Sequence, residues 1–142
     1  MNKKIIIIPI VIVIAIFVIN FSSDSEKKID DIFHITLASP DLYIDGKFTE
    51  TFEINKGEYS FRFVPNGSSP KILSINLNGD DFQFSQDFKL EGTLHQTGIS
   101  EYFTWEYLGE KNFEISEKQN LTISINPNGN VMGSVSVDIL EN

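Results

Sequence analysis

The side chains that could do chemistry in this chain are its carboxylates, its two histidines and a short aromatic run. A serine triad needs a histidine between an acid and a hydroxyl, and the chain has only two histidines, His34 and His95. His95 lies in the stretch HQTGIS, with Ser100 and Glu101 near it. This stretch lacks the G-x-S-x-G turn that presents a nucleophile. We therefore expect His95 to be a solvated loop residue and His34 to be an ordinary residue on a strand face.

Oxygen ligands for a metal ion occur in two turn-like stretches. One contains Asp41 and Asp45, and the other contains Asp80 and Asp81. These four aspartates are candidate calcium ligands, but neither stretch has the ligand spacing and terminal glutamate of a calcium loop. Ordinary turn chemistry is the favoured interpretation. The absence of cysteine excludes disulfides, thiol catalysis and zinc-thiolate sites, and we expect no cofactor.

No pair among the 20 acidic residues stands out as the two carboxylates that a glycoside hydrolase needs. Without that pair, a triad or a metal site, we expect a protein that is not an enzyme.

The aromatic run Tyr102-Phe103-Thr104-Trp105-Glu106-Tyr107 places Phe103, Trp105 and Tyr107 on one face of a strand. If aromatic side chains of this run face solvent, Tyr102, Trp105 and Tyr107 are candidates for stacking on sugar rings or for a protein-binding hot spot. If the Trp105 face is inward, Trp105 is the core tryptophan between two sheets. The inward orientation is favoured.

From residue 32 onward, apolar and polar residues alternate with a period of two, which indicates strands with one buried face. Turn signals such as Asp45-Gly46 and Asn78-Gly79 separate them. About ten short strands without helical periodicity are typical of an antiparallel β-sandwich of Greek-key or jelly-roll type. We expect strands at 33–39, 41–44, 47–54, 58–64, 71–77, 81–84, 88–94, 101–108, 112–116, 120–126 and 134–140.

The stretch Ile54-Asn55-Lys56-Gly57-Glu58-Tyr59 has the spacing of a tyrosine corner. In this device, the glycine permits a tight crossover between sheets and the tyrosine hydroxyl bonds to backbone a few residues upstream. We therefore assign Gly57 and Tyr59 structural roles.

The amino-terminal segment 5–21, IIIIPIVIVIAIFVINF, is uncharged and follows Lys3 and Lys4. A helix of this length spans about 25 Å, slightly less than the hydrocarbon core of about 30 Å. After the segment, only Ser23-Asp24-Ser25 offers a weak match to a small-residue cleavage site, so we expect residues 1–21 to be an uncleaved anchor helix. If the segment is cleaved, the protein is secreted.

The leading lysines predict a cytosolic amino terminus, so a polar tether (22–31) would hold the domain 32–142 outside the membrane. The whole chain carries a charge of −9, and the part after the anchor carries −11 because Lys3 and Lys4 precede it. This acidity disfavours nucleic acid as a partner. Asn66 and Asn120 match the glycosylation acceptor pattern.

The stretch GEYSFRFVPNGSSPKILSINL resembles part of the GOLD (emp24-type) β-sandwich, a protein-interaction module. The resemblance implies a sandwich ectodomain, although the paired cysteines of many such domains are missing and the membrane segment lies at the other end. Prokaryotic type IV pilin-like subunits also join an apolar amino-terminal helix to an outer β-domain. The processing site of that class has a small residue before the apolar run and usually a glutamate shortly after it, and both landmarks are absent here.

These observations together predict a membrane-anchored extracytoplasmic domain that acts as an interaction or accessory module of the cell envelope, with a protein partner at the cell surface. The alternatives are a carbohydrate-binding module that uses the aromatic residues around Trp105 and a pilin-like surface subunit.

Overall fold

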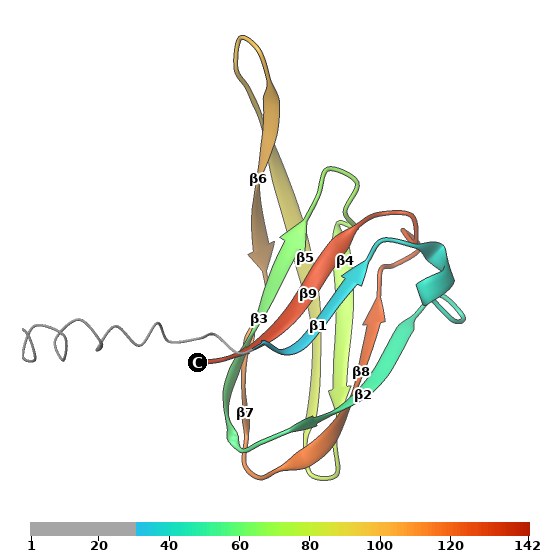
Figure 1. Ribbon diagram of the computed structural model, residues 1–142, viewed down its shortest axis with the longest axis vertical. Coiled ribbons are helices and arrows are strands. Elements are labelled where there is room, and N and C mark those ends of the chain that lie inside the picture. The colour runs from blue at the N-terminus through green and yellow to red at the C-terminus, as the bar shows by residue number, and fades with distance from the viewer. Residues whose placement is uncertain (1–30) are drawn as a thin grey trace, which may run out of the picture.

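The computed structural model describes residues 31–142 (Figure 1). The predicted anchor (1–21) and nearly all of the predicted tether lie outside the described residues. Between residues 31 and 142, no helix is long and apolar enough to cross a membrane.

The described residues form two antiparallel sheets, so the prediction of an all-β domain is confirmed. The four-stranded sheet has the order β1-β9-β3-β7, and the five-stranded sheet has the order β2-β8-β4-β5-β6. The strands of the first are β1 (Asp31–Leu37), β9 (Val135–Glu141), β3 (Gly57–Pro65) and β7 (Asn112–Ile115). Those of the second are β2 (Phe48–Ile54), β8 (Gln119–Asn126), β4 (Ile72–Asn78), β5 (Gln83–Gln96) and β6 (Glu101–Leu108).

The two sheets pack face to face as a sandwich, and alternation along each strand supplies the core. Leu121, Ile123 and Ile125 of β8 are fully buried. Between the sheets, the ring centroids of Phe61 and Phe88 are 5.5 Å apart. Burial of large apolar side chains contributes roughly 1.5–3 kcal/mol each, and this core stabilises a domain that has no disulfide.

The predicted strand at 41–44 is wrong, because residues Pro40–Leu42 form a short 3-10 helix, η1. Pro40 suits the first helical position, and the Ser39 hydroxyl accepts a hydrogen bond from the amide of Asp41 (3.4 Å). The Asp45-Gly46 turn that follows has positive φ at both residues, 51° and 79°.

The predicted strands 81–84 and 88–94 are one continuous strand, β5, of 14 residues. Ser85 and Asp87, which resemble a turn in the sequence, pair in register with Asn76 and Ser74 of β4. This pairing with β4 ends at Lys89, whereas pairing with β6 continues to Gln96. The β5–β6 hairpin therefore extends beyond the other strands, as Figure 1 shows. We call residues 91–106 the arm.

The Tyr59 hydroxyl donates a hydrogen bond to the backbone carbonyl of Asn55, four residues upstream (2.9 Å). A Cβ atom on Gly57 would lie 3.3 Å from that hydroxyl, closer than ordinary van der Waals contact. This is the arrangement expected of a tyrosine corner. It fixes the connection from β2 in one sheet to β3 in the other.

Candidate functional site

The arm ends in a tight turn that exposes an apolar side chain. The amide of Thr97 donates to the carbonyl of Ser100 (2.7 Å), and the amide of Ser100 donates back to the Thr97 hydroxyl (2.9 Å). Between them, Ile99 is fully exposed. A large apolar residue at the tip of a projecting hairpin is available for contact with another molecule.

One face of the arm is apolar. Leu94 lies opposite Phe103 in register, and both are 45% exposed. The rings of Phe103 and Trp105 stack with centroids 5.9 Å apart. Nearer the body, Tyr107 packs edge-on against Phe63 of β3 at 5.2 Å. The apolar face therefore continues the inner face of the sandwich beyond its core, and Trp105 lies half-buried at this margin rather than at the centre of the core.

The opposite face of the arm carries His95, Tyr102 and Thr104. The His95 ring stacks on Tyr102 with centroids 4.9 Å apart, and its Nε2 atom is 2.8 Å from the Thr104 hydroxyl. His95 is therefore a half-buried residue of β5, so its predicted place in a solvated loop is wrong. Of the three predicted aromatic binding residues, Trp105 and Tyr107 share one face, and Tyr102 lies on the other.

Gly92 allows the Trp105 ring to lie against the backbone of β5. These two residues are opposite in register, and a Cβ atom on Gly92 would come within 2.9 Å of the indole ring carbons. The sequence prediction passed over this residue. A glycine inside a strand does often mark a close approach, so the signal was present in the sequence.

A buried carboxylate lies on the outer face of the four-stranded sheet. Asp138 of β9 is 1% exposed, and both Nε and an Nη of Arg62 bind its Oδ2 atom at 2.8 Å. On its other side, His34 Nδ1 is hydrogen-bonded to Asp138 Oδ1. The hydrogen bond to Asp138 is the main cause that raises the pKa of Arg62. Because His34 and Arg62 cover Asp138 from both neighbouring strands, this carboxylate is buried without being unpaired.

The same cluster has two features that resemble functional sites. Ligand atoms of Asp31, His34 and Asp138 lie within 4.8 Å of one another, and the Thr36 hydroxyl is 3.3 Å from His34 Nε2. However, the Arg62 guanidinium already supplies the positive charge, and Thr36 lies exposed on an open sheet face. We interpret the cluster as a structural ion network.

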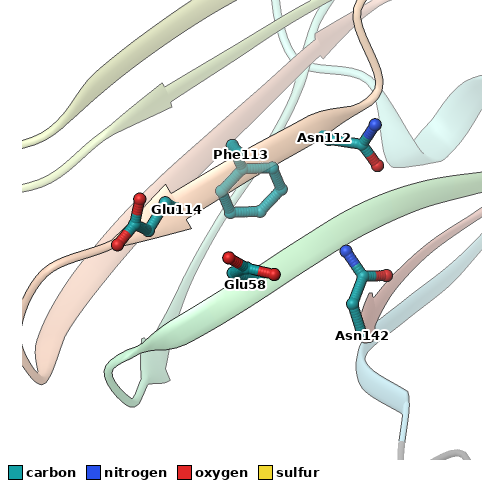
Figure 2. A pocket seen from close by; sticks show the side chains of 5 residues that line it. All are labelled: Glu58, Asn112, Phe113, Glu114 and Asn142. Carbon is teal, nitrogen blue, oxygen red and sulfur yellow. The ribbon is translucent and has the colours of Figure 1, made fainter.

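A shallow hollow of about 490 Å³ opens beside β3 and β7 (Figure 2). Glu58 and Glu114 are directly opposite in register, yet their carboxylates do not point toward one another. The lining is completed by Asn112, Phe113 and Asn142. The exposed carboxylates and amides give this hollow an acidic rim.

The predicted calcium ligands lie in separate turns. Asp41 is in η1 and Asp45 is in the turn after it, whereas Asp80 and Asp81 lie between β4 and β5; all four are exposed. None belongs to the cluster of possible metal ligands found among the described residues.

The two predicted glycosylation residues are both exposed. Asn66 lies after β3, where its side-chain oxygen accepts hydrogen bonds from the amide (2.9 Å) and the hydroxyl (2.7 Å) of Ser68. Asn120 lies on β8. Glycosylation at either asparagine stays a prediction.

No protein-family model, curated protein or solved structure matches this chain. Its function has to be inferred from its own sequence and geometry, in which the arm is the most prominent feature.

Proposed function

We propose that this protein is a membrane-anchored, extracytoplasmic and non-catalytic interaction module of the cell envelope, and that the arm is its contact element. One observation carries this proposal: the arm projects from the sandwich with large apolar side chains in solvent. Ile99 is fully exposed, and Leu94 and Phe103 are each 45% exposed. Exposed aromatic and aliphatic groups on a rigid element are typical anchors of protein interfaces.

The sequence supports the location. Residues 5–21 are uncharged and, apart from Asn20, apolar, and two lysines precede them, as in an uncleaved helical anchor with a cytosolic amino terminus. On this proposal the sandwich, of Greek-key or jelly-roll type and similar to GOLD domains, is held outside the membrane. Fractionation of cells should recover the full chain with the membrane and resistant to alkaline extraction. Recovery in the medium would mean that the segment is cleaved.

The arm can be tested with a photo-crosslinking amino acid in place of Ile99 in intact cells. We expect a discrete crosslinked protein band. The control carries the same amino acid in place of Thr51, which is exposed on β2 at the opposite edge of the same sheet. Equal labelling from both positions, or no band from the arm, would contradict the proposed contact element.

Carbohydrate binding is the second candidate, and the half-exposed Trp105 is the observation in its favour. Tyr102 lies on the opposite face of the arm, so these two rings cannot form one platform. Trp105 is the sole tryptophan of the chain, so its fluorescence reports directly on this face. Saturable quenching by soluble glycans would favour a lectin-like role over a protein contact.

A further inference from the structure

The edge of the five-stranded sheet at β6 lacks most of the features that usually block strand pairing. Among the described residues, β6 pairs only with β5, in an unbroken register from Lys89↔Leu108 to Gln96↔Glu101. Its sequence, EYFTWEYL, has neither proline nor lysine. Natural proteins usually protect exposed edges with such residues, with bulges or with short strands. An edge of eight residues whose only charged side chains are Glu101 and Glu106 is therefore suited to pairing with another strand.

The hydrogen bonds fix which backbone groups of β6 face outward. The amide of Thr97 donates a hydrogen bond to the carbonyl of Ser100, so Thr97 and Ser100 form a hydrogen-bonded pair. From this pair onward, hydrogen-bonded and non-hydrogen-bonded residue pairs alternate between β5 and β6. Even-numbered residues of β6 bond to β5. The amide of Leu90 bonds to Lys71 on the β4 side of β5, in agreement with this alternation. Outward-facing N–H and C=O groups therefore belong to the odd-numbered residues Glu101, Phe103, Trp105 and Tyr107.

The outward N–H and C=O groups of one β6 strand can pair with the same groups of a second copy. In an antiparallel pair of two β6 strands centred on Thr104, Phe103 of one copy lies opposite Trp105 of the other, and Glu101 lies opposite Tyr107. Both members of each pair have outward peptide groups, so each pair exchanges two hydrogen bonds. The side chains of each pair also point to the same face of the sheet, because all four residues are odd-numbered.

The side chains favour the same register. Phe103 and Trp105 would form aromatic cross-strand pairs on the apolar face, which stabilise a sheet. On the other face, Tyr102 would lie opposite Glu106, so no two carboxylates of β6 oppose each other directly. Because the two β6 strands run antiparallel and the β5–β6 hairpin extends beyond the other strands (Figure 1), the two sandwiches would sit at opposite ends of the paired strands.

We propose that the partner of the arm is a second copy of this chain, joined through antiparallel β6–β6 pairing about a two-fold axis at Thr104. This inference rests on the proposed function, because it names the partner of the same arm. One surface patch serves both subunits, as in most symmetric dimers.

Disulfide trapping in the full chain, purified in detergent, tests the pairing, because the natural chain has no cysteine. In the proposed dimer the two Thr104 Cα atoms are about 4.5 Å apart, within the disulfide range of about 4.4–6.8 Å. We expect Thr104→Cys to give a covalent dimer under mild oxidation. Glu106→Cys is the matched control on the same face, because its Cα atoms would be about 14 Å apart at about 3.4 Å per residue.

A proline variant tests the backbone bonds. Phe103→Pro removes an outward N–H group but no bond to β5, whereas Phe103→Ala shortens the side chain and keeps the N–H group. In the Thr104→Cys background we expect Phe103→Pro to lower the dimer yield about thirtyfold relative to Phe103→Ala, because the symmetric dimer loses two hydrogen bonds, one donated by each copy.

The outcomes separate the two proposals. If Thr104→Cys yields no more covalent dimer than Glu106→Cys does, self-pairing is overturned. If Ile99 then still crosslinks a different protein in cells, the interaction role stands with another partner. If neither experiment yields a product, both proposals fail.

Discussion

At the scale of single residues, Asp138 is the buried charged side chain of the described domain. Its carboxylate is buried, but both oxygens are bonded, to His34 and to Arg62. Breaking a buried ion pair from one side leaves an uncompensated charge and costs about 3–5 kcal/mol. Arg62 and His34 are partly exposed and can regain solvent, so the cost here should lie at or somewhat below the lower end of this range.

We predict that Asp138→Ala lowers the free energy of unfolding by about 2–3 kcal/mol, as measured by urea denaturation. Asp31→Ala is the control. Asp31 is 42% exposed and lies 3.6 Å from Arg62, so its loss should cost less than about 1 kcal/mol. Equal effects from the two variants would show that burial of Asp138 does not matter as described.

The second prediction concerns Tyr59 and alkaline pH. Burial, and then the charge of Glu141, raise the pKa of Tyr59 above the usual tyrosine value, which is about 10. The folded state therefore resists ionisation of this hydroxyl. The contribution of the un-ionised Tyr59 hydroxyl to stability is complete below about pH 10 and is lost as the pH rises through the raised pKa.

Tyr59→Phe should cost about 1 kcal/mol at neutral pH, because the hydrogen bond to Asn55 is lost. It should also make unfolding less sensitive to pH above about 10. Denaturant titrations at neutral and alkaline pH measure both effects. The exposed Tyr102→Phe is the control and should change stability by less than about 0.5 kcal/mol; identical alkaline profiles for Tyr59→Phe and the natural chain would contradict the account.

At the scale of the elements, two glycines around β6 should respond differently to alanine. At Gly92 a new Cβ meets the outer ring carbons of Trp105, which can swing into solvent. At Gly109, which follows β6, φ is +143° and the new Cβ would lie 2.8 Å from the buried Phe88 ring. The clash at Gly92 can be relieved by movement of Trp105, whereas the clash and the positive φ at Gly109 cannot be relieved in this way.

We therefore predict that Gly92→Ala shifts the Trp105 emission to longer wavelength and costs less than about 1 kcal/mol, whereas Gly109→Ala costs about 1–3 kcal/mol from backbone strain. Fluorescence spectra and urea unfolding of both variants test this. An unchanged Trp105 spectrum in Gly92→Ala would mean that the ring does not lie on β5.

The strands that the sequence predicted best are those with clean alternation. Strand β6 has the predicted bounds 101–108, because Phe103, Trp105 and Tyr107 recur at every second position through its centre. The sequence predicts two strands in place of β5, because Gln86 occupies an inward position between Phe84 and Phe88 and interrupts the apolar alternation. The proline-led helix at Pro40 was missed because Leu42 and Ile44 continue the apparent alternation beyond it.

The candidate site was predictable in part. Alternation places Trp105 and Tyr107 on one face, but whether that face is covered depends on where β4 and the opposite sheet end, which is not local information. The Asp138 network was not predictable for the same reason, since its partners His34 and Arg62 lie 104 and 76 residues away in sequence.

At the scale of the whole molecule, charge opposes self-association. The chain after the predicted anchor carries a net charge of −11, so two copies repel one another at low ionic strength. Salt screens exposed charges over about 10 Å at 0.1 M and about 3 Å at 1 M. We predict that dimerisation of the natural chain, measured by sedimentation in detergent, strengthens with added salt. Weakening with salt would indicate an interface held by ion pairs rather than by paired strands.

Hydrogen exchange of single amides in β6, measured on the full chain in detergent at low and high protein concentration, tests the self-pairing most directly. The account predicts that the amides of Tyr102, Thr104 and Glu106, which bond to β5, are protected at both concentrations. Those of Phe103, Trp105 and Tyr107 should exchange rapidly in the dilute sample and become protected in the concentrated one. Rapid exchange of these three amides at every concentration would contradict the pairing of β6 with a second copy.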